Sequence, residues 1–354
     1  MNTLVTAAFQ KTTWTVIRNC SHYNKTLKRS FSVTDKFLLA QNLGERTVLK
    51  LKGNDCHLYL QGLITNDIGH LQGGSSSIFA MFLNNKGRVL CDTIVYNSGI
   101  ENTFFIECDH NAALQLSEHL MRYKVRRKIT IENVGEELTI WALANNNCLN
   151  QCDEDCDYKK IGNLIKEKVP HIITTGDPRL RNMGLRIIVP RNLNICNEME
   201  KLTGLKVEEG NFYKLLRYKL GIAEGNKELP PEKCFPMEIN GDYMHGISFH
   251  KGCYIGQELT ARTHYTGVIR KRVMPITFTE KTEACEHGTP IFSAEQTNKA
   301  IGKLFGIEGK NGLALLRIED ALSAPELLVS SSKCKTHHPF WWPIEAPKMK
   351  MNPG

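Results

Sequence analysis

The chain has 354 residues, of which 41% are hydrophobic and 23% charged, and its formal net charge is +8. This is ordinary globular usage, so it excludes a long disordered chain, a collagen-like repeat and a coiled coil. At about 150 residues per domain the length predicts two or three domains. No apolar run approaches the roughly 18 residues that cross a bilayer, so we expect no membrane partner.

The first 34 residues contain no acidic residue and carry five of the eight net positive charges. Such a cationic segment, rich in Ser and Thr, is typical of a mitochondrial presequence. The run at 29–32 resembles a processing site, so we predict a transit peptide over 1–31 and a location in the mitochondrial matrix. The alternative is a disordered basic arm. Since the remaining chain is only weakly basic, we expect no nucleic-acid partner.

The pattern that follows predicts mixed strands and helices. In chain order, the expected elements are a strand pair over 37–51, a helix from about 55 to 64, strands over 78–83, 89–96 and 104–107, and a helix over 111–126. Asn54 or Asp55 is placed to cap the first helix and Asp109 the second, because a short Asx side chain accepts the free amide hydrogens of a first turn. The first helix is expected to bury Leu58, Leu60, Leu63 and Ile64. In the second helix Leu114, Met121 and Val125 recur near helical spacing, which predicts its apolar face.

The rest of the chain continues this alternation of strands and helices up to about residue 220, and beyond Gly267 it consists of short strands. Strands are expected over 138–143, 172–174 and 185–189, helices over 161–169, 197–203 and 211–220, and short strands over 270–278, 290–293, 300–307 and 312–318. Gly221 is placed to stop the third of these helices. The short strands with Gly-rich turns predict a small β-barrel, so the fold class is α+β with a C-terminal barrel.

The twelve cysteines are scattered, with no C-x-x-C pair and no secretory signal. A disulfide framework and a structural zinc site are therefore not expected. Cys148, Cys152 and Cys156 form one cluster, but their polar and acidic surroundings are typical of a solvated loop. We predict no metal site.

The most unusual segment is residues 250–262, which begins H-K-G-C-Y-I-G-Q-E. Two glycines give its backbone freedom to turn tightly. Lys251 lies next but one to Cys253 and could favour the thiolate, because a nearby cation lowers a cysteine pKa. Glu258 and Arg262 are four residues apart and can pair on a helix face. The alternative interpretation is a β-turn, an ordinary helix cap and a buried cysteine.

Residues 251–258 match the K-G-C-Y-x-G-Q-E motif of the YgfZ-type folate-binding family, whose members are related to the glycine-cleavage T-protein, an aminomethyltransferase. The longer run to Arg272 is similar to the mitochondrial branch of that family, which contains iron-sulfur cluster assembly factors. Further matching pieces lie at 62–67, 84–96, 122–128, 177–184, 229–240 and 312–317. The resemblance covers roughly residues 37–318.

This resemblance implies a T-protein-like multidomain fold, with a C-terminal β-barrel and a pocket for tetrahydrofolate. It divides the chain into a folate-binding α+β domain (36–135 with 205–265), a second α+β domain (136–204), a barrel (266–330) and a tail (331–354). It also implies a matrix role in maturing four-iron four-sulfur proteins such as aconitase and the lipoate-making enzymes, with haem synthesis downstream. The implied partners are A-type iron-sulfur carrier proteins and the recipient apoproteins.

The resemblance also suggests site residues. Cys253 is the candidate catalytic residue, and the candidate folate-binding residues are Asp92, Arg217, Lys251, Tyr254, Gln257, Glu258 and Arg262. Folate needs a carboxylate for its ring donors and cations for its glutamate tail, and Arg217 is a candidate for the tail. Where the T-protein has two successive acidic residues, this chain has Cys91 and Asp92, a departure that weighs against aminomethyl transfer.

Three functions follow from these observations. The first, which we favour, is an assembly factor that binds folate and uses Cys253 to handle sulfur, iron or a one-carbon adduct. The second is a folate-dependent one-carbon transferase in which Asp92 orients or protonates the folate amine. The third is a tRNA-modification accessory protein that uses the basic residues between Arg262 and Arg272. The sequence leaves enzymatic activity open.

Overall fold

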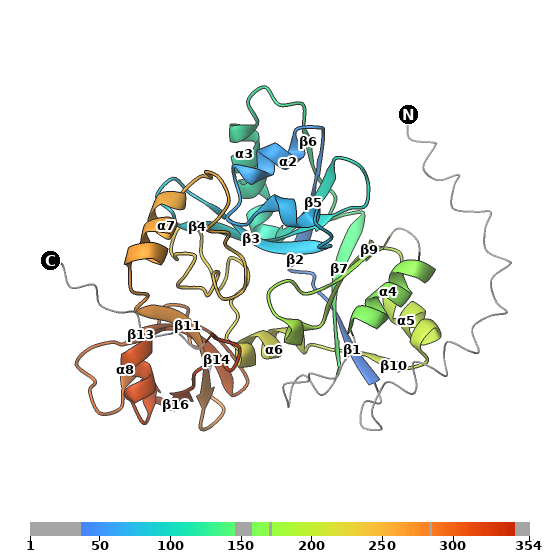
Figure 1. Ribbon diagram of the computed structural model, residues 1–354. Helices are drawn as coiled ribbons and strands as arrows, with labels where there is room; N and C mark the ends of the chain where they lie inside the picture. The colour runs from blue at the N-terminus through green and yellow to red at the C-terminus, as the bar shows by residue number, and fades with distance from the viewer. Residues whose placement is uncertain (1–36, 146–157, 170–171, 283–284, 344–354) are drawn as a thin grey trace.

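The computed structural model describes residues 37–145, 158–169, 172–282 and 285–343. The predicted transit peptide, the cluster of Cys148, Cys152 and Cys156, and the end of the predicted tail lie outside these residues. Within the described ranges no helix is long and apolar enough to cross a membrane. The chain forms two sheet-and-helix units and a barrel, which Figure 1 shows arranged around the short central helix α6 (Tyr213–Leu220).

The first unit is a five-stranded sheet with helices on one face. Its strands lie in the order β3 (Ser77–Leu83), β4 (Val89–Asn97), β5 (Thr103–Asp109), β2 (Arg46–Lys52) and β6 (Thr130–Asn133). The helices α2 (Cys56–Gln61) and α3 (Ala113–Lys124), with the 3-10 turns η2 (Ile68–Leu71) and η3 (His110–Ala112), bury Leu60, Leu116 and Leu120 against it. The strands predicted over 78–83, 89–96 and 104–107 are confirmed as β3, β4 and β5, and β3 pairs with β4 as a hairpin.

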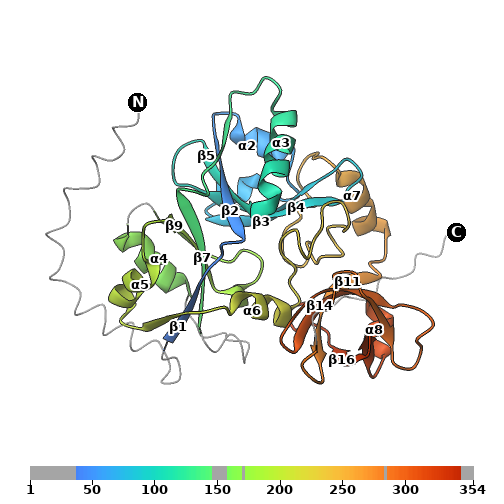
Figure 2. The same cartoon turned by 180° about the vertical axis from the view of Figure 1, so that it is seen from behind.

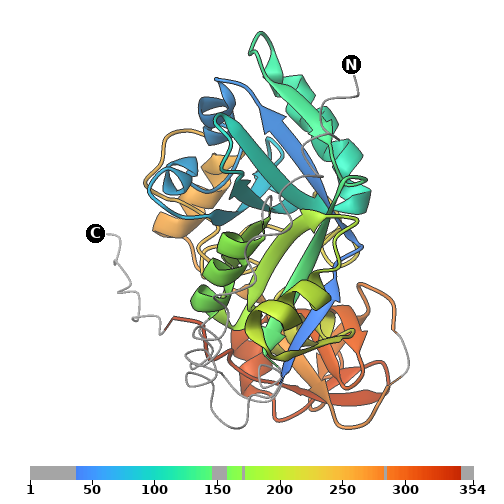
Figure 3. The ribbon, with the colours of Figure 1, turned by 90° about the vertical axis from the view of Figure 1, so that its right-hand side faces the viewer.

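The second unit is another five-stranded sheet. Its order is β10 (Lys206–Glu209), β1 (Phe37–Asn42), β7 (Leu138–Asn145), β9 (Leu185–Pro190) and β8 (Ile173–Gly176). Helices α4 (Tyr158–Lys168) and α5 (Ile195–Thr203) cover its outer face, which Figure 3 views directly, and the 3-10 turn η5 (Arg181–Met183) precedes β9. The predicted helices over 161–169 and 197–203 are thus confirmed.

The third unit is a closed six-stranded barrel, as predicted. Its strands follow the order β11 (Lys271–Phe278), β14 (Asn311–Arg317), β13 (Gly302–Glu308), β12 (Pro290–Ser293), β15 (Leu327–Val329) and β16 (Ser332–Thr336), with α8 (Ile318–Ser323) after β14. The barrel includes β16, so it extends past the end predicted at residue 330. Beyond it, Trp342 joins the barrel core, and Trp341 Nε1 donates to Leu220 O (2.8 Å).

A central apolar core joins the three units. It contains residues of both sheets, of α6 and of β11, β13 and β14. Figure 2 shows from behind how the long loop after α6 and the helix α7 (Gln257–Thr266) connect the first sheet to the barrel. Gly221 stops α6 in the left-handed conformation (φ 76°), as predicted.

Strand β1 differs from its prediction. β1 and β2 do not pair with each other: β1 pairs with β7 and β10 in the second sheet, and β2 pairs with β5 and β6 in the first. The predicted grouping of 36–135 and 205–265 therefore cuts across the second sheet, which contains both β1 and β10. Short sequence separation favours a hairpin, but the chain turns away after Leu43, whose N–H donates to Ile140 O (2.8 Å).

The apolar face of α3 differs from its prediction, and that of α2 differs at one residue, Leu58, while the predicted Leu60, Leu63 and Ile64 are buried. Asp109 caps the turn before α3 as expected, accepting from Asn111 N at 2.7 Å. However, Leu114, Met121 and Val125 are 72%, 54% and 81% exposed, and Leu58 of α2 is 72% exposed. Ala113, Leu116 and Leu120 lie on the buried side instead, so the apolar residues chosen from the sequence gave the wrong face.

Candidate functional site

The loop that carries the cysteine motif is fastened to the first sheet by its lysine. Lys251 Nζ donates to Ile64 O (2.8 Å) and Asn66 O (2.7 Å), the backbone that follows α2. Burial lowers the pKa of this ammonium to about 8, although nearby Asp67 acts in the opposite direction. The ammonium thus links the motif loop to the segment that follows α2, although the bonded residues are 185 or more positions apart in the sequence.

The second half of the loop docks on the β3–β4 hairpin. Gly256 has φ +77°, and a Cβ there would lie 2.3 Å from Asn84 O and 2.9 Å from Leu83 Cβ. Ile255 N donates to Gly62 O (3.1 Å). Gln257 Oε1 accepts from Tyr254 N (3.1 Å) at the start of α7. Only glycine fits at 256, because its backbone is left-handed and another backbone passes at contact distance.

Between these fastenings the loop presents its thiol to solvent. Cys253 is exposed, and it is the one exposed cysteine among the eight that lie in the described ranges. Gly252 beside it has open space where a Cβ would be. The alternative of a buried motif cysteine is therefore wrong. Burial raises the pKa of other thiols, such as Cys56 and Cys234 (each to about 11), so these remain protonated thiols.

The remaining motif residues surround this loop. Tyr254 packs against the central core, and burial raises the pKa of its phenol to about 12. Glu258 and Arg262 are exposed on α7. Their pairing stays a prediction. Lys251, Tyr254, Gln257, Glu258 and Arg262 thus share one segment with Cys253.

Three aromatic residues beside the motif were missed by the sequence analysis. The rings of Phe249 and His264 stack at 3.5 Å and 11°. Tyr265, 66% exposed, packs edge-on against His264 and donates its O–H to Phe249 O at 3.4 Å. Phe249 precedes the motif, whereas His264 and Tyr265 lie in α7. Their contact could not be predicted, because no local periodicity links residues about 15 positions apart.

Asp92 lies elsewhere, inside the molecule. It is 2% exposed; its Oδ2 pairs with Arg46 (3.0 Å) and its Oδ1 accepts from Gly225 N (3.0 Å). Both carboxylate oxygens are therefore engaged by the protein. The structure does not bring Asp92 together with Cys253.

Asp92 belongs to a buried ionic network between the two sheets. Its cations are Arg46, Arg179, Arg186 and Arg217, and its carboxylates are Asp92, Glu107, Asp177, Glu224 and Glu228. Burial alone would raise the pKa of Glu224, but Arg179 and Arg46 outweigh it and hold that pKa well below its usual value. Tyr213 adds an O–H donated to Glu224 (2.6 Å).

Arg217 lies in this network and also in the wall of a cavity. Its two terminal nitrogens donate to Glu228 (2.7 and 2.9 Å), while its Nε is buried without a hydrogen-bond partner in the described structure. The cavity has a volume of about 590 Å³, and all three units contribute to its wall. Besides Arg217, the wall includes the stacked pair His287 and Phe305 (5.1 Å).

Within the described ranges no three His, Cys, Asp or Glu side chains converge as a metal site. The site geometry thus consists of one exposed thiol on a fastened loop, and a separate internal cavity beside an ionic network. The architecture of two sheet units and a C-terminal barrel defines a T-protein-like protein. A solved aminomethyltransferase T of the glycine cleavage system from Bartonella henselae has the same fold, with a TM-score of 0.65, 14% identity and coverage of 86% of this chain and 85% of that one.

Sequence comparison identifies the family. The chain is 35% identical over 322 residues to the mitochondrial iron-sulfur cluster assembly factor IBA57 of Mus musculus, covering 86% of this chain and 85% of the relative. It is 34% identical to the Homo sapiens protein of that name, covering 85% and 84%. Residues 270–344 match the family described as CAF17, C-terminal beta-barrel domain. The chain belongs to the IBA57 family, and the relatives' names agree with the predicted mitochondrial location.

Proposed function

We propose that this chain is a matrix assembly factor for four-iron four-sulfur proteins and that Cys253 is the residue that contacts the cargo. The observation that carries this proposal is the exposure of Cys253 on a loop that Lys251 and Gly256 hold in place. A-type carrier proteins and recipient apoproteins, including aconitase and lipoate-making enzymes, are the partners. The IBA57 relatives are named as iron-sulfur assembly factors, which supports this choice.

The chemistry follows from the thiol and from what surrounds it. A cysteine thiolate is the usual protein ligand of iron in an iron-sulfur cluster, and a cluster takes about four such ligands. Since no three metal-ligating side chains converge in the described structure, Cys253 supplies one ligand and the partner supplies the others. Such sharing suits a factor that passes a cluster on, because neither protein holds it completely.

Tetrahydrofolate fits the 590 Å³ cavity rather than the motif loop. The buried Arg217 Nε makes no hydrogen bond in the described structure, with Glu224 Oε1 3.8 Å away, so a ligand could provide a closer acceptor. His287 and Phe305 offer an aromatic wall for a ring. The exposed Lys214 and Lys227 also line the cavity; they pair with Glu308 (3.1 Å) and Glu45 (2.6 Å), and a glutamate tail would compete for these ammonium groups. Bound folate would supply a carrier for one-carbon units. The residues of this chain would bind and orient it.

Two alternatives receive no support. A one-carbon transferase would need a carboxylate free to meet the folate amine, but both oxygens of Asp92 are held by Arg46 and Gly225. An RNA-binding role would need exposed cations up to Arg272. Arg272 is 1% exposed and pairs with Asp242 (2.7 Å).

The test compares two cysteine variants in cells that lack the native protein. We expect Cys253→Ser to abolish recovery of aconitase activity and lipoylation, because it removes the cargo ligand and little else. The matched control is Cys196→Ser, which removes a half-buried thiol from the second sheet unit and should retain recovery.

Thermal unfolding and tetrahydrofolate binding are measured on both purified variants. Unchanged values for Cys253→Ser, together with lost maturation, would support the proposal. Full maturation by Cys253→Ser would overturn the role of the thiol. Loss of folate binding in Arg217→Lys, but not in either cysteine variant, would support the internal cavity as the folate site.

A further inference from the structure

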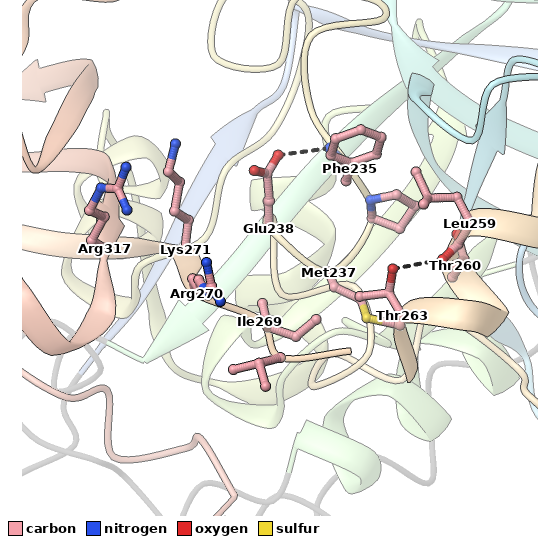
Figure 4. A pocket seen from close by; sticks show the side chains of 12 residues that line it. Phe235, Met237, Glu238, Leu259, Thr260, Thr263, Ile269, Arg270, Lys271 and Arg317 are labelled. Carbon is pink, nitrogen blue, oxygen red and sulfur yellow. Dashed lines mark hydrogen bonds between the residues drawn. The ribbon is translucent and has the colours of Figure 1, made fainter. Parts of the chain in front are cut away.

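A second cavity, of about 700 Å³, is lined in part by α7, the helix that begins within the motif. Its wall is built by α7, by the loop around Met237 and by the residues that lead into the barrel (Figure 4). None of these residues lines the cavity that we assign to folate. Its volume is within the range of small-molecule sites, about 300–1,000 Å³.

Three cations stand together on one side of this cavity. They are Arg270, Lys271 and Arg317, the last two at the ends of β11 and β14. The strand register places Lys271 directly opposite Arg317. Ile318 N donates to Arg270 O (3.1 Å), which holds the third cation beside them. Like charges opposite each other on paired strands destabilise a sheet.

The protein does not neutralise this repulsion itself. Across the described residues no carboxylate forms an ion pair with any of the three cations. The cavity has one carboxylate, Glu238, which Figure 4 shows between Lys271 and Phe235; its Oε2 accepts from Phe235 N (3.1 Å), and in the described part of the chain it forms no ion pair with the three cations. An anion from outside the chain would therefore relieve an electrostatic conflict that the fold leaves open.

The facing wall is apolar. Phe235 and Leu259 contribute side chains to it, with Met237, which is 4% exposed. The Arg88 guanidinium stacks on the ring of Phe235, 4.4 Å from the ring centroid, and this contact holds the ring in position. One side of the cavity thus suits an apolar or aromatic body, and the other side suits an anionic group.

We propose that this cavity binds a small amphiphilic anion, an apolar or aromatic molecule that carries a carboxylate, phosphate or sulfonate. The anionic group lies between Lys271 and Arg317, whose donors form charge-assisted hydrogen bonds with it. The apolar body packs against Phe235 and Leu259. This site is independent of the proposed thiol chemistry and of the folate cavity.

The probes are a matched pair of dyes on the full-length protein. One is 8-anilinonaphthalene-1-sulfonate, and the other is N-phenyl-1-naphthylamine, which has the same apolar body without the sulfonate. In the double variant K271Q/R317Q we expect the Kd of the anionic dye to rise about tenfold or more. The neutral dye should change less than about twofold. Lys335→Gln, an exposed cation of β16 that does not line the cavity, is the control and should leave both constants unchanged.

A thermal readout shows whether the variant is folded. Because K271Q/R317Q removes facing like charges, its Tm without dye should equal or exceed that of the native protein. The anionic dye should raise the native Tm but not the variant's. An unchanged Kd for the anionic dye would overturn the proposal. So would equal losses for both dyes, which would mean that the cations only shape the cavity. Folate binding is measured in parallel and should be unaffected, so failure here is distinct from failure of the folate assignment.

Discussion

The buried ionic network and the motif loop hold their charged residues in opposite ways. In the network, four arginines and five carboxylates are almost fully buried and form ion pairs with one another between the two sheets. In the loop, charge serves only for attachment: Lys251 donates to two backbone carbonyls, and the thiol beside it faces water. Asp92 therefore has a structural role in the interior of this T-protein-like fold, and the exposed loop is the place where we propose the chemistry.

The difference shows why resemblance in fold does not transfer a mechanism. In this chain the candidate carboxylate, Asp92 of β4, is part of an ion pair with Arg46 of β2 inside the first sheet unit. The reactive group that we propose instead, Cys253, lies exposed on a surface loop, where a protein partner can reach it. A buried ion pair resists removal of one partner, because the other is left charged and unpaired. The two regions should therefore respond very differently to substitution.

The largest expected effect comes from breaking the network at Arg186. This residue is 0% exposed, and its Nη2 lies 3.0 Å from Glu107 Oε1 and 3.0 Å from Glu224 Oε2. Arg186→Met should lower the free energy of unfolding by about 3–5 kcal/mol, because two buried carboxylates lose a counter-charge. The measurement is equilibrium unfolding in urea.

Its control is an exposed ion pair of the same unit. Lys201 pairs with Glu198 at 2.7 Å, and the Lys201 side chain is 69% exposed. Lys201→Met should cost no more than about 1 kcal/mol. If Arg186→Met cost as little as this control, the network would not hold the sheets together as we describe.

A smaller effect is expected from the two glycines that flank Cys253. Gly256→Ala places a methyl group 2.3 Å from Asn84 O on a left-handed backbone. It should cost about 1–3 kcal/mol and release the loop from the hairpin. Gly252→Ala meets open space and should cost less than about 0.5 kcal/mol. Urea unfolding gives the cost of each, and aconitase maturation in cells should fall for Gly256→Ala only. Equal maturation by the two variants would mean that loop position does not matter for the thiol.

Much of the fold could be predicted from the sequence because the signals are local. The β3–β4 hairpin, the Asp109 cap, the Gly221 stop and the barrel strands each depend on a few adjacent residues. The partner of β1 could not be predicted, since an alternating strand does not specify which strand it pairs with. The face of α3 was wrong because the helix has apolar residues on both sides: Leu116 and Leu120 are buried, while Leu114 and Met121 are exposed.

The site was predictable only as far as the motif is contiguous. Residues 251–258 stand together in sequence and in space. Arg46, Glu107 and Arg186, which decide what Asp92 can do, come from three different strands. The cationic side of the second cavity depends on the register of β11 with β14, which brings Lys271 opposite Arg317 across 46 residues of chain. Only the folded chain shows such pairings.

The smallest expected effect is a pH dependence that tests how Lys251 fastens the loop. Its folded pKa of about 8 lies below its unfolded value of about 10.5. Between these values the unfolded chain binds more protons, so the contribution of Lys251 to stability rises with pH and is constant below about pH 8. The unfolding free energy of the native protein relative to Lys251→Met should therefore rise by about 1 kcal/mol between pH 8 and 10, once partial exposure is allowed for.

Lys335→Met, which removes an exposed ammonium, is the control. A decrease over that range would mean that the carbonyls of Ile64 and Asn66 bind the ammonium more strongly than burial disfavours it. The positive charge of Lys251 would then stabilise the folded protein, as the charges of the buried network do.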